Sequence, residues 1–191
     1  MKILKRILIV LAVIFAVLLV VSLFLPSKVR VERSMIINAP TEIVFDQINN
    51  LHNWEAWSPW RKMEPEAQLT YNNIPSGNGA SFSWVGKKTG EGSLTITESV
   101  PNEKIVTALD FKGQGQSVGG FDFNKEESGV KVNWYMNMES QNPFMKYMSM
   151  IMKGMMKDQF DEGLKGIKQI SESMPIQPEP VPAATDSIPH Q

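Results

Sequence analysis

The sequence predicts an α+β domain, made of a curved antiparallel sheet and a long C-terminal helix, with one transmembrane helix in front of it. Three observations carry this prediction: a long apolar run at the N-terminus, a central region of alternating apolar and polar residues, and a final segment of helical periodicity. We expect an anchor over residues 1–26, the domain over residues 27–174 and a disordered proline-rich tail over residues 175–191.

The N-terminal run, Ile7 to Leu25, contains nineteen positions, of which only Ser22 is polar. About 20 helical residues cross the roughly 30 Å core of a bilayer, so the run predicts a single-pass membrane anchor. A cleaved secretory signal is the alternative, because basic residues precede the run. The length of the run and the lack of a small-x-small cleavage site argue against it. The basic N-terminus favours a domain outside the cytoplasm.

Composition narrows the range of functions. The net charge of -1 leaves no basic footprint for a nucleic acid. With no cysteine and two histidines, the chain offers no ligand set for a tetrahedral metal site. We therefore expect no nucleic-acid partner, no metal and no cofactor. The segment Gly115 to Gly119 matches the G-x-S-x-G pattern of serine hydrolases, but it falls between predicted strands and is interpreted as a glycine-rich loop.

The first elements of the domain follow from alternation and from helix signals. A strand is expected from Val29 to Ile37, and a helix from Thr41 to Ile48, with Pro40 suited to the first turn. Trp54 and Trp57, three residues apart, would share one face of a short helix.

The remaining elements follow from two different periods. Residues 68–138 alternate with period two between turn residues, which predicts an antiparallel meander with one apolar face. The segment Pro143 to Ser173 predicts an amphipathic helix of about eight turns that covers this face. Its first half carries a second apolar stripe, which suggests a cavity mouth, a lid or contact with a membrane: Phe144, Tyr147, Ile151 and Met155.

Several motifs resemble the START-like helix-grip superfamily, and within it the polyketide cyclase/dehydrase-like group also called SRPBCC. The carriers are Asn38 to Phe45, the W-x-x-W-S-P-W segment Trp54 to Trp60, and two glycine pairs at residues 77–79 and 90–92. The resemblance spans Val29 to Ser173. It implies a deep cavity between sheet and helix that accepts hydrophobic molecules, and it implies no single chemistry.

We therefore predict a membrane-anchored domain that binds a hydrophobic or lipid-like small molecule. The residues expected to contact this molecule are apolar: Trp57, Trp84, Leu109, Phe111, Trp134, Met136, Met148, Met152 and Met156. Ordinary core packing is the other interpretation of the tryptophans and methionines.

Two further function classes stay open. A cyclase or dehydratase-type enzyme would need a polar group with a perturbed pKa inside the cavity, although no catalytic residue is predicted. A membrane-tethered protein-interaction or stress-response module would be favoured by a solid core without a cavity.

Overall fold

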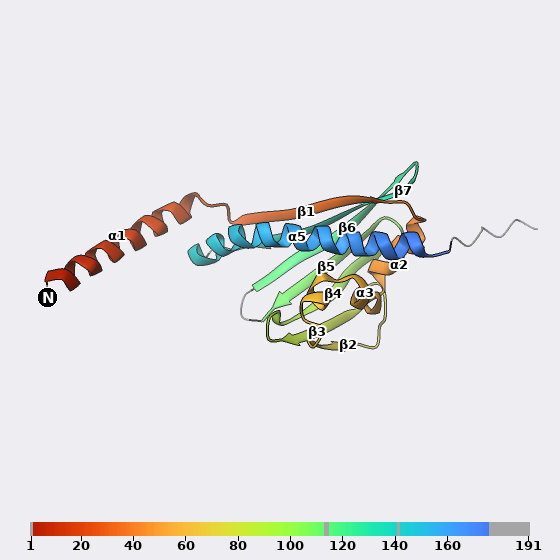
Figure 1. Ribbon diagram of the computed structural model, residues 1–191, viewed down its shortest axis with the longest axis horizontal. Helices are drawn as coiled ribbons and strands as arrows, with labels where there is room; N and C mark the ends of the chain where they lie inside the picture. Colours follow the sequence, from red (N-terminus) through yellow and green to blue (C-terminus); the bar gives the residue numbers. More distant parts are fainter. Residues whose placement is uncertain (1, 113–114, 141, 176–191) are drawn as a thin grey trace, which may run out of the picture.

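The computed structural model describes residues 2–112, 115–140 and 142–175, and it confirms the predicted α+β architecture (Figure 1). The predicted tail lies outside the described residues, apart from Pro175. The elements in chain order are α1 (Lys2–Phe24), β1 (Lys28–Ile37), α2 (Thr41–Asn49), a 3₁₀ turn η1 (Leu51–Asn53), α3 (Trp54–Trp57), α4 (Pro59–Met63), β2 (Gln68–Tyr71), β3 (Ser81–Gly86), β4 (Gly90–Val100), β5 (Lys104–Phe111), β6 (Gly115–Glu126), β7 (Gly129–Glu139) and α5 (Pro143–Ser173).

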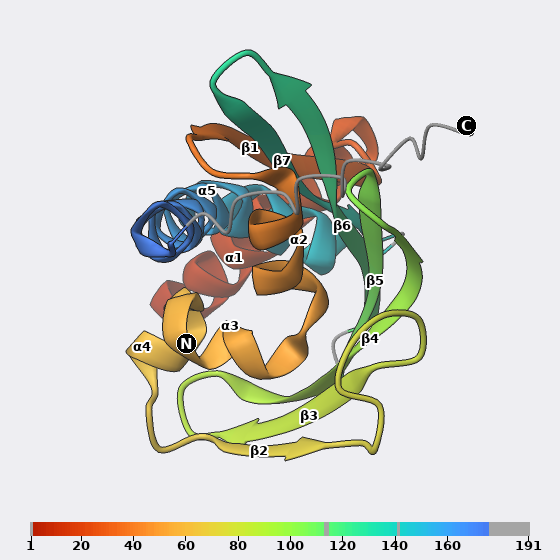
Figure 2. The same cartoon turned by 90° about the vertical axis from the view of Figure 1, so that its right-hand side faces the viewer.

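The seven strands form one antiparallel sheet in the order β1-β7-β6-β5-β4-β3-β2. Strands β2 to β7 are the predicted meander, and β1 extends the sheet beside β7. The sheet curls so that its concave face encloses α2, α3 and α5 (Figure 2). A sheet with one apolar face must cover that face, and here the helices provide the cover.

The register of the strands defines two ends of the concave face. Val29, five residues after α1, pairs with Met138, and the row continues through Ser117 to Leu109. We call this the α1 end of the sheet. Further along the strands, Trp134 pairs with Phe121 and Phe121 with Ile105, and we call this the Trp134 end.

The prediction of a glycine-rich loop at residues 115–119 was wrong, because these residues begin strand β6. Ser117 pairs with Leu109 on one side and Met138 on the other, so neighbouring strands fix the backbone. The same strand shows why a glycine is needed nearby: a Cβ on Gly120 would lie 2.5 Å from the Ile105 carbonyl oxygen. A close cross-strand approach therefore explains this glycine, and a turn does not.

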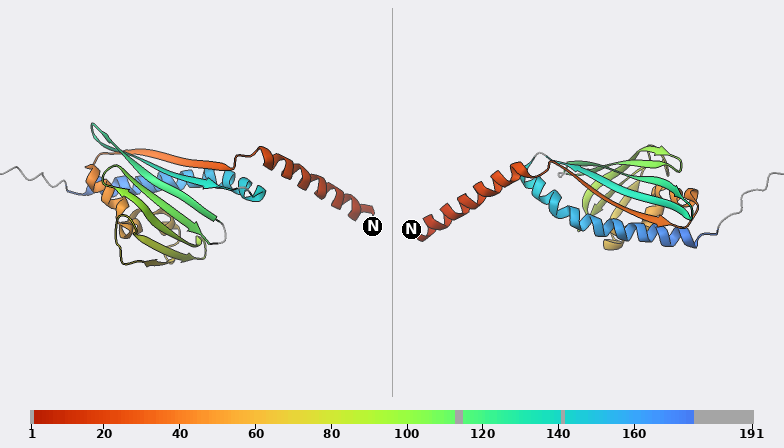
Figure 3. Two further views of the ribbon diagram at one scale, coloured as in Figure 1. Left: turned by 180° about the vertical axis from the view of Figure 1, so that it is seen from behind. Right: turned by 90° about the horizontal axis from the view of Figure 1, so that it is seen from above.

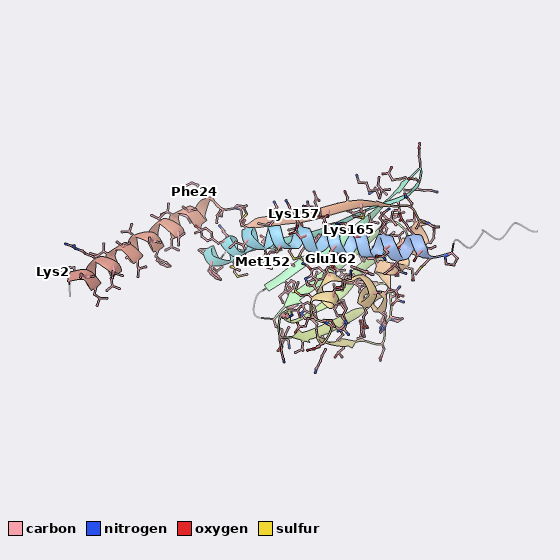
Figure 4. All side chains as sticks on the ribbon, in the orientation of Figure 1. Lys2, Phe24, Met152, Lys157, Glu162 and Lys165 are labelled. Carbon is pink, nitrogen blue, oxygen red and sulfur yellow. The ribbon has the colours of Figure 1, made fainter. Side chains whose placement is uncertain are left out.

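Helix α1 extends away from the domain (Figure 1), and its side chains project from it on all sides (Figure 4). It is long and apolar enough to cross a bilayer, and a signal sequence meets the same criterion. Its large apolar side chains are all exposed, from 42% to 84%. Among its described residues only Ser22 is buried, where α5 lies against the last turns of α1.

Candidate functional site

The Trp134 end of the concave face is filled with aromatic rings. Trp134 stacks on Phe160 of α5 at 4.1 Å between centroids, with the planes 6° apart, and on Phe121 of β6 at 4.8 Å. The rings of Trp57 and Trp60 meet Trp134 edge-on, both at 5.7 Å. Trp134 is 4% exposed and Trp57 is fully buried. Such stacked and edge-on pairs add to the stability gained from burial alone, so this end is a packed core.

The tryptophans of α3 also complete the end of α2. The indole N–H of Trp54 donates to the Ile48 carbonyl at 2.8 Å, and that of Trp57 donates to the Gln47 carbonyl at 2.9 Å. The last carbonyls of a helix lack partners within the helix, and these two bonds satisfy them. The W-x-x-W spacing therefore places two indole donors at the C-terminal end of α2. This role was not predicted from the sequence.

The α1 end is apolar and unevenly covered: Val29, Met138 and Leu94 are buried, whereas the residues toward β3 are less completely covered. Trp84 of β3, Leu109 and Phe111 of β5 are half-buried, and the Trp84 and Phe111 rings meet at 5.8 Å. Trp84 leans over Gly92, where a Cβ would come within 2.3 Å of the indole. On α5, the half nearest α1 carries three half-buried methionines: Met145, Met148 and Met152.

The structure thus divides the predicted contact residues into two groups. Trp57, Trp134 and Met156 are buried at the Trp134 end, in line with the core-packing interpretation. Met136, in the row between the two ends, is equally buried, at 4% exposed. The other group is half-buried and lies at the α1 end or on the α5 half beside it: Trp84, Leu109, Phe111, Met148 and Met152. Phe82 joins the two groups, with its ring 6.2 Å from Trp54 and 6.1 Å from Trp84.

Two surface hollows of similar size occur in the described part of the chain. One, of about 340 Å³, lies over β4 to β7, and both polar and apolar residues line it: Thr95, Asp110 and Asn137 with Leu109 and Val118 among others. The other, of about 330 Å³, lies between α3, α4 and α5 near Ala56 and Gly166. Neither lies between the concave face and α5. A ligand at the α1 end would therefore require side chains there to move apart, which unbranched methionines do readily.

Two buried polar groups were not predicted from the sequence. Thr107 is 3% exposed and lies in the row of Met136 and Gly119. The side-chain oxygen of Gln159 is buried and accepts no hydrogen bond among the described residues. Gln159 follows Met152 by seven residues, so both occupy nearly the same side of α5. A buried acceptor without a donor is costly, and a ligand donor would remove that cost.

Two groups with shifted pKa values lie away from the concave centre. The Glu64 carboxylate accepts backbone N–H bonds from Lys87, Lys88 and Thr89 and a hydroxyl bond from Thr89, which lower its pKa to about 2. Burial and the hydrogen bond to Glu55 raise the pKa of Tyr71. Glu64 is thus a fixed anion in the β3–β4 turn, and Tyr71 stays a protonated donor at the edge strand β2. Neither is poised as a general base.

Comparison with known families adds to this geometry. Residues 28–172 match the family described as polyketide cyclase / dehydrase and lipid transport. The chain belongs to this family. The match runs from the first residue of β1 almost to the end of α5, so it covers the sheet and helix together and excludes α1. The resemblance seen in the sequence is confirmed, and with it the helix-grip arrangement. No curated protein matches the chain in sequence.

Solved structures share the fold of the polyketide cyclase / dehydrase family at low sequence identity. The Aha1 dimer from Colwellia psychrerythraea has a TM-score of 0.55 and 13% identity, with 76% of this chain and 97% of that one covered. The di-domain ARO/CYC StfQ from the steffimycin biosynthetic pathway has a TM-score of 0.57 and 13% identity, with 76% and 51% covered. Protein SA2116 from Staphylococcus aureus, of unknown function, has a TM-score of 0.57 and 14% identity, with 76% and 94% covered. These similarities concern the fold alone.

Proposed function

We propose that the protein is a single-pass membrane protein whose domain binds a hydrophobic or lipid-like small molecule at the α1 end of the concave face. The observation that carries the proposal is the uneven burial of that face. Trp134 is packed on all sides, whereas Trp84, Leu109 and Phe111 remain half-buried although they belong to the same apolar sheet surface. Apolar area left partly in water gains free energy when a ligand covers it, at about 25 cal/mol per Å².

The second wall of this site is the methionine-rich half of α5. Met148 and Met152 are half-buried and can change rotamer to admit molecules of different shape. Gln159 and Thr107 would orient a polar headgroup or hydroxyl, since each brings an oxygen into an apolar surrounding. The family description includes lipid transport, which agrees with such a ligand.

The position of the site relative to α1 supports a ligand drawn from the bilayer. Helix α1 ends four residues before β1, and β1 enters the sheet at the α1 end. An anchored domain would therefore hold its half-open end toward the membrane surface. Following the basic N-terminus, we propose that the domain lies outside the cytoplasm.

Native mass spectrometry of the full-length chain, released from mild detergent, tests the proposal. We expect the chain to carry an added mass that disappears on denaturation. If the ligand is lost during purification, the added mass should appear after incubation with a lipid extract. Leu109→Trp should abolish it by filling the α1 end. Val118→Trp, on the neighbouring strand at a side chain 49% exposed, is the matched control and should keep it. An added mass retained by both variants would place the ligand elsewhere.

A protein-interaction module is the second candidate. The filled Trp134 end and the location of both hollows outside the concave face favour it. Absence of any bound mass in the unmodified chain, together with no uptake from the lipid extract, would support this candidate over the first.

A further inference from the structure

A second apolar surface lies on the outside of α5, in the half that follows Asn142. Its large side chains Phe144, Ile151 and Met155 are 68%, 62% and 65% exposed. At about 100° per residue they fall within roughly 40° of one another, so they form one line along the helix. We call these three residues the outer stripe. They point away from the buried residues of α5, such as Met156 and Phe160, which lie on another side of the helix. Met148, seven residues before Met155, lies on nearly the same line, at the border between the outer stripe and the proposed groove.

The outer stripe stops abruptly along the same line of the helix. Seven residues beyond Ile151 and Met155 stand Asp158 and Glu162, and seven beyond those stand Lys165 and Gln169. Figure 4 labels Met152, on the apolar half, and Glu162 and Lys165, on the charged half. The outer face of α5 is thus apolar over the first half of the helix and polar over the second half.

The apolar half is also the part of α5 that contacts α1. The Tyr147 hydroxyl donates to the Leu18 carbonyl at 2.8 Å, and the Lys146 ammonium donates to the Ser22 carbonyl at 3.3 Å. The two helices lie side by side only at this point, and α1 then leads away from the domain (Figure 3). Leu18 precedes the end of α1 at Phe24 by six residues, or about 9 Å of helix.

We infer that the outer stripe docks on the lipid bilayer that α1 spans, so that the first half of α5 is an interfacial helix. The inference rests on the anchor in the proposed function. An interfacial helix buries its apolar face about 5–10 Å deep, and the contact at Leu18 sets a similar depth for Tyr147. Tyrosine is enriched at this level because its ring is apolar and its hydroxyl is polar.

The distribution of charge along α5 agrees with a lipid surface as the partner. From Pro143 to Lys157 the chain carries no acidic residue, and the first carboxylate is Asp158, where the outer stripe ends. The three lysines of this half lie on roughly the opposite side of the helix, so the stripe itself carries no charge that docking would place in the apolar part of the bilayer. Docking of this half would set the methionine side of the groove directly at the membrane surface, where a lipid could enter without crossing water.

Lipid quenching of single-cysteine variants of the full-length chain tests the inference, because the protein has no cysteine of its own. A fluorophore is placed in turn at Ile151→Cys, Met155→Cys, Gln169→Cys and Val10→Cys, in nanodiscs of phosphatidylcholine with a minority of phosphatidylglycerol and a spin-labelled quencher lipid. We expect the labels at positions 151 and 155 to be quenched several-fold more than the label at position 169, which lies on the same line of α5.

The label at position 10 separates the two ways in which the idea can fail. Quenching at position 10 with none at 151 and 155 would overturn the docking and leave the anchor intact. No quenching at position 10 would remove the anchor and the docking with it. Ligand binding is measured separately, as the added mass in native mass spectrometry. A failure to bind ligand would therefore be distinguished from a failure of docking or of anchoring.

Discussion

The two halves of α5 have a similar spacing of apolar residues but different neighbours in the structure. In the second half, Phe160, Leu164 and Ile167 are fully buried against the sheet and the short helices. In the first half, Ser149 and Met156 are buried, while Phe144 and Ile151 are mostly exposed. The spacing of apolar residues at three and four positions is similar in both.

The difference shows that an apolar stripe predicts that something will cover it, and does not say what. Trp134 and its aromatic neighbours cover the second half, so its apolar residues serve stability. Among the described residues no comparable cluster covers the first half of α5, and it is there that we propose contact with a ligand and with the membrane. The residues with the greatest burial are accordingly the poorest candidates for binding.

The largest expected effect compares side-chain truncations at the Trp134 end and at the α1 end of the concave face. Trp134→Ala should destabilise the domain by about 3–5 kcal/mol, because it opens a cavity among stacked rings. Leu109→Ala, at the half-buried α1 end, should cost about 1–2 kcal/mol, because less apolar area is lost from the core. Urea unfolding of the detergent-solubilised chain, followed by circular dichroism, measures both. Equal costs would mean that the two ends are packed alike.

Substitution of two glycines of α5 by alanine should change the stability of the domain in opposite directions. A Cβ on Gly163 would lie 2.6 Å from the Trp134 ring, whereas a Cβ on Gly154 would meet nothing within 4 Å. Gly163→Ala should therefore destabilise by about 1–3 kcal/mol through overpacking. Gly154→Ala should stabilise by up to about 1 kcal/mol through helix propensity. The same unfolding experiment applies, and a loss of stability in Gly154→Ala would indicate a packed neighbour at this half.

A smaller effect is expected where α5 meets α1. Tyr147→Phe removes the hydroxyl that donates to Leu18, which should weaken the contact by about 1 kcal/mol. Spin labels at cysteines replacing Leu11 and Asp158 report the distance between the helices by pulsed electron resonance in nanodiscs. We expect a broader distance distribution for Tyr147→Phe. The control Tyr135→Phe on β7 should leave the distribution unchanged. An unchanged distribution in both would show that the hydrogen bond does not hold the helices together.

The smallest effect concerns pH at the β3–β4 turn, where the Trp84 indole N–H donates to Thr89. The pKa of Glu64 is lowered from 4.5 to about 2, so its stabilising effect is full above the unfolded pKa and is lost as pH falls toward the folded value. The protection factors of the amides of residues 87–89, which are exchange rates corrected for the intrinsic effect of pH, should change little down to about pH 4 and then fall. Glu64→Gln should lower these protection factors at all pH values. A fall in protection already near neutral pH would contradict the assigned cause.

Much of the fold could be predicted because its signals are local. The bounds of α5 match the prediction, and those of β1 and α2 differ from it by one residue, since turn residues and the apolar period mark these ends in the sequence. The start of β6 was missed because glycines in a strand resemble a loop until the neighbouring strands are known. For the site, the apolar face was predicted correctly as a surface, but its division into a packed and a half-buried end was not.

The sequence by itself determined the apolar N-terminal helix, the alternating sheet, the amphipathic helix and the family, because each depends on spacing along the chain. Tertiary structure alone decided that Trp57 and Trp134 are enclosed, that the Gln159 side-chain oxygen has no donor among the described residues, and that Tyr147 contacts α1. The physical reason is that burial and hydrogen bonding depend on strand register and helix placement, which join residues more than a hundred positions apart, as Tyr147 and Leu18 are.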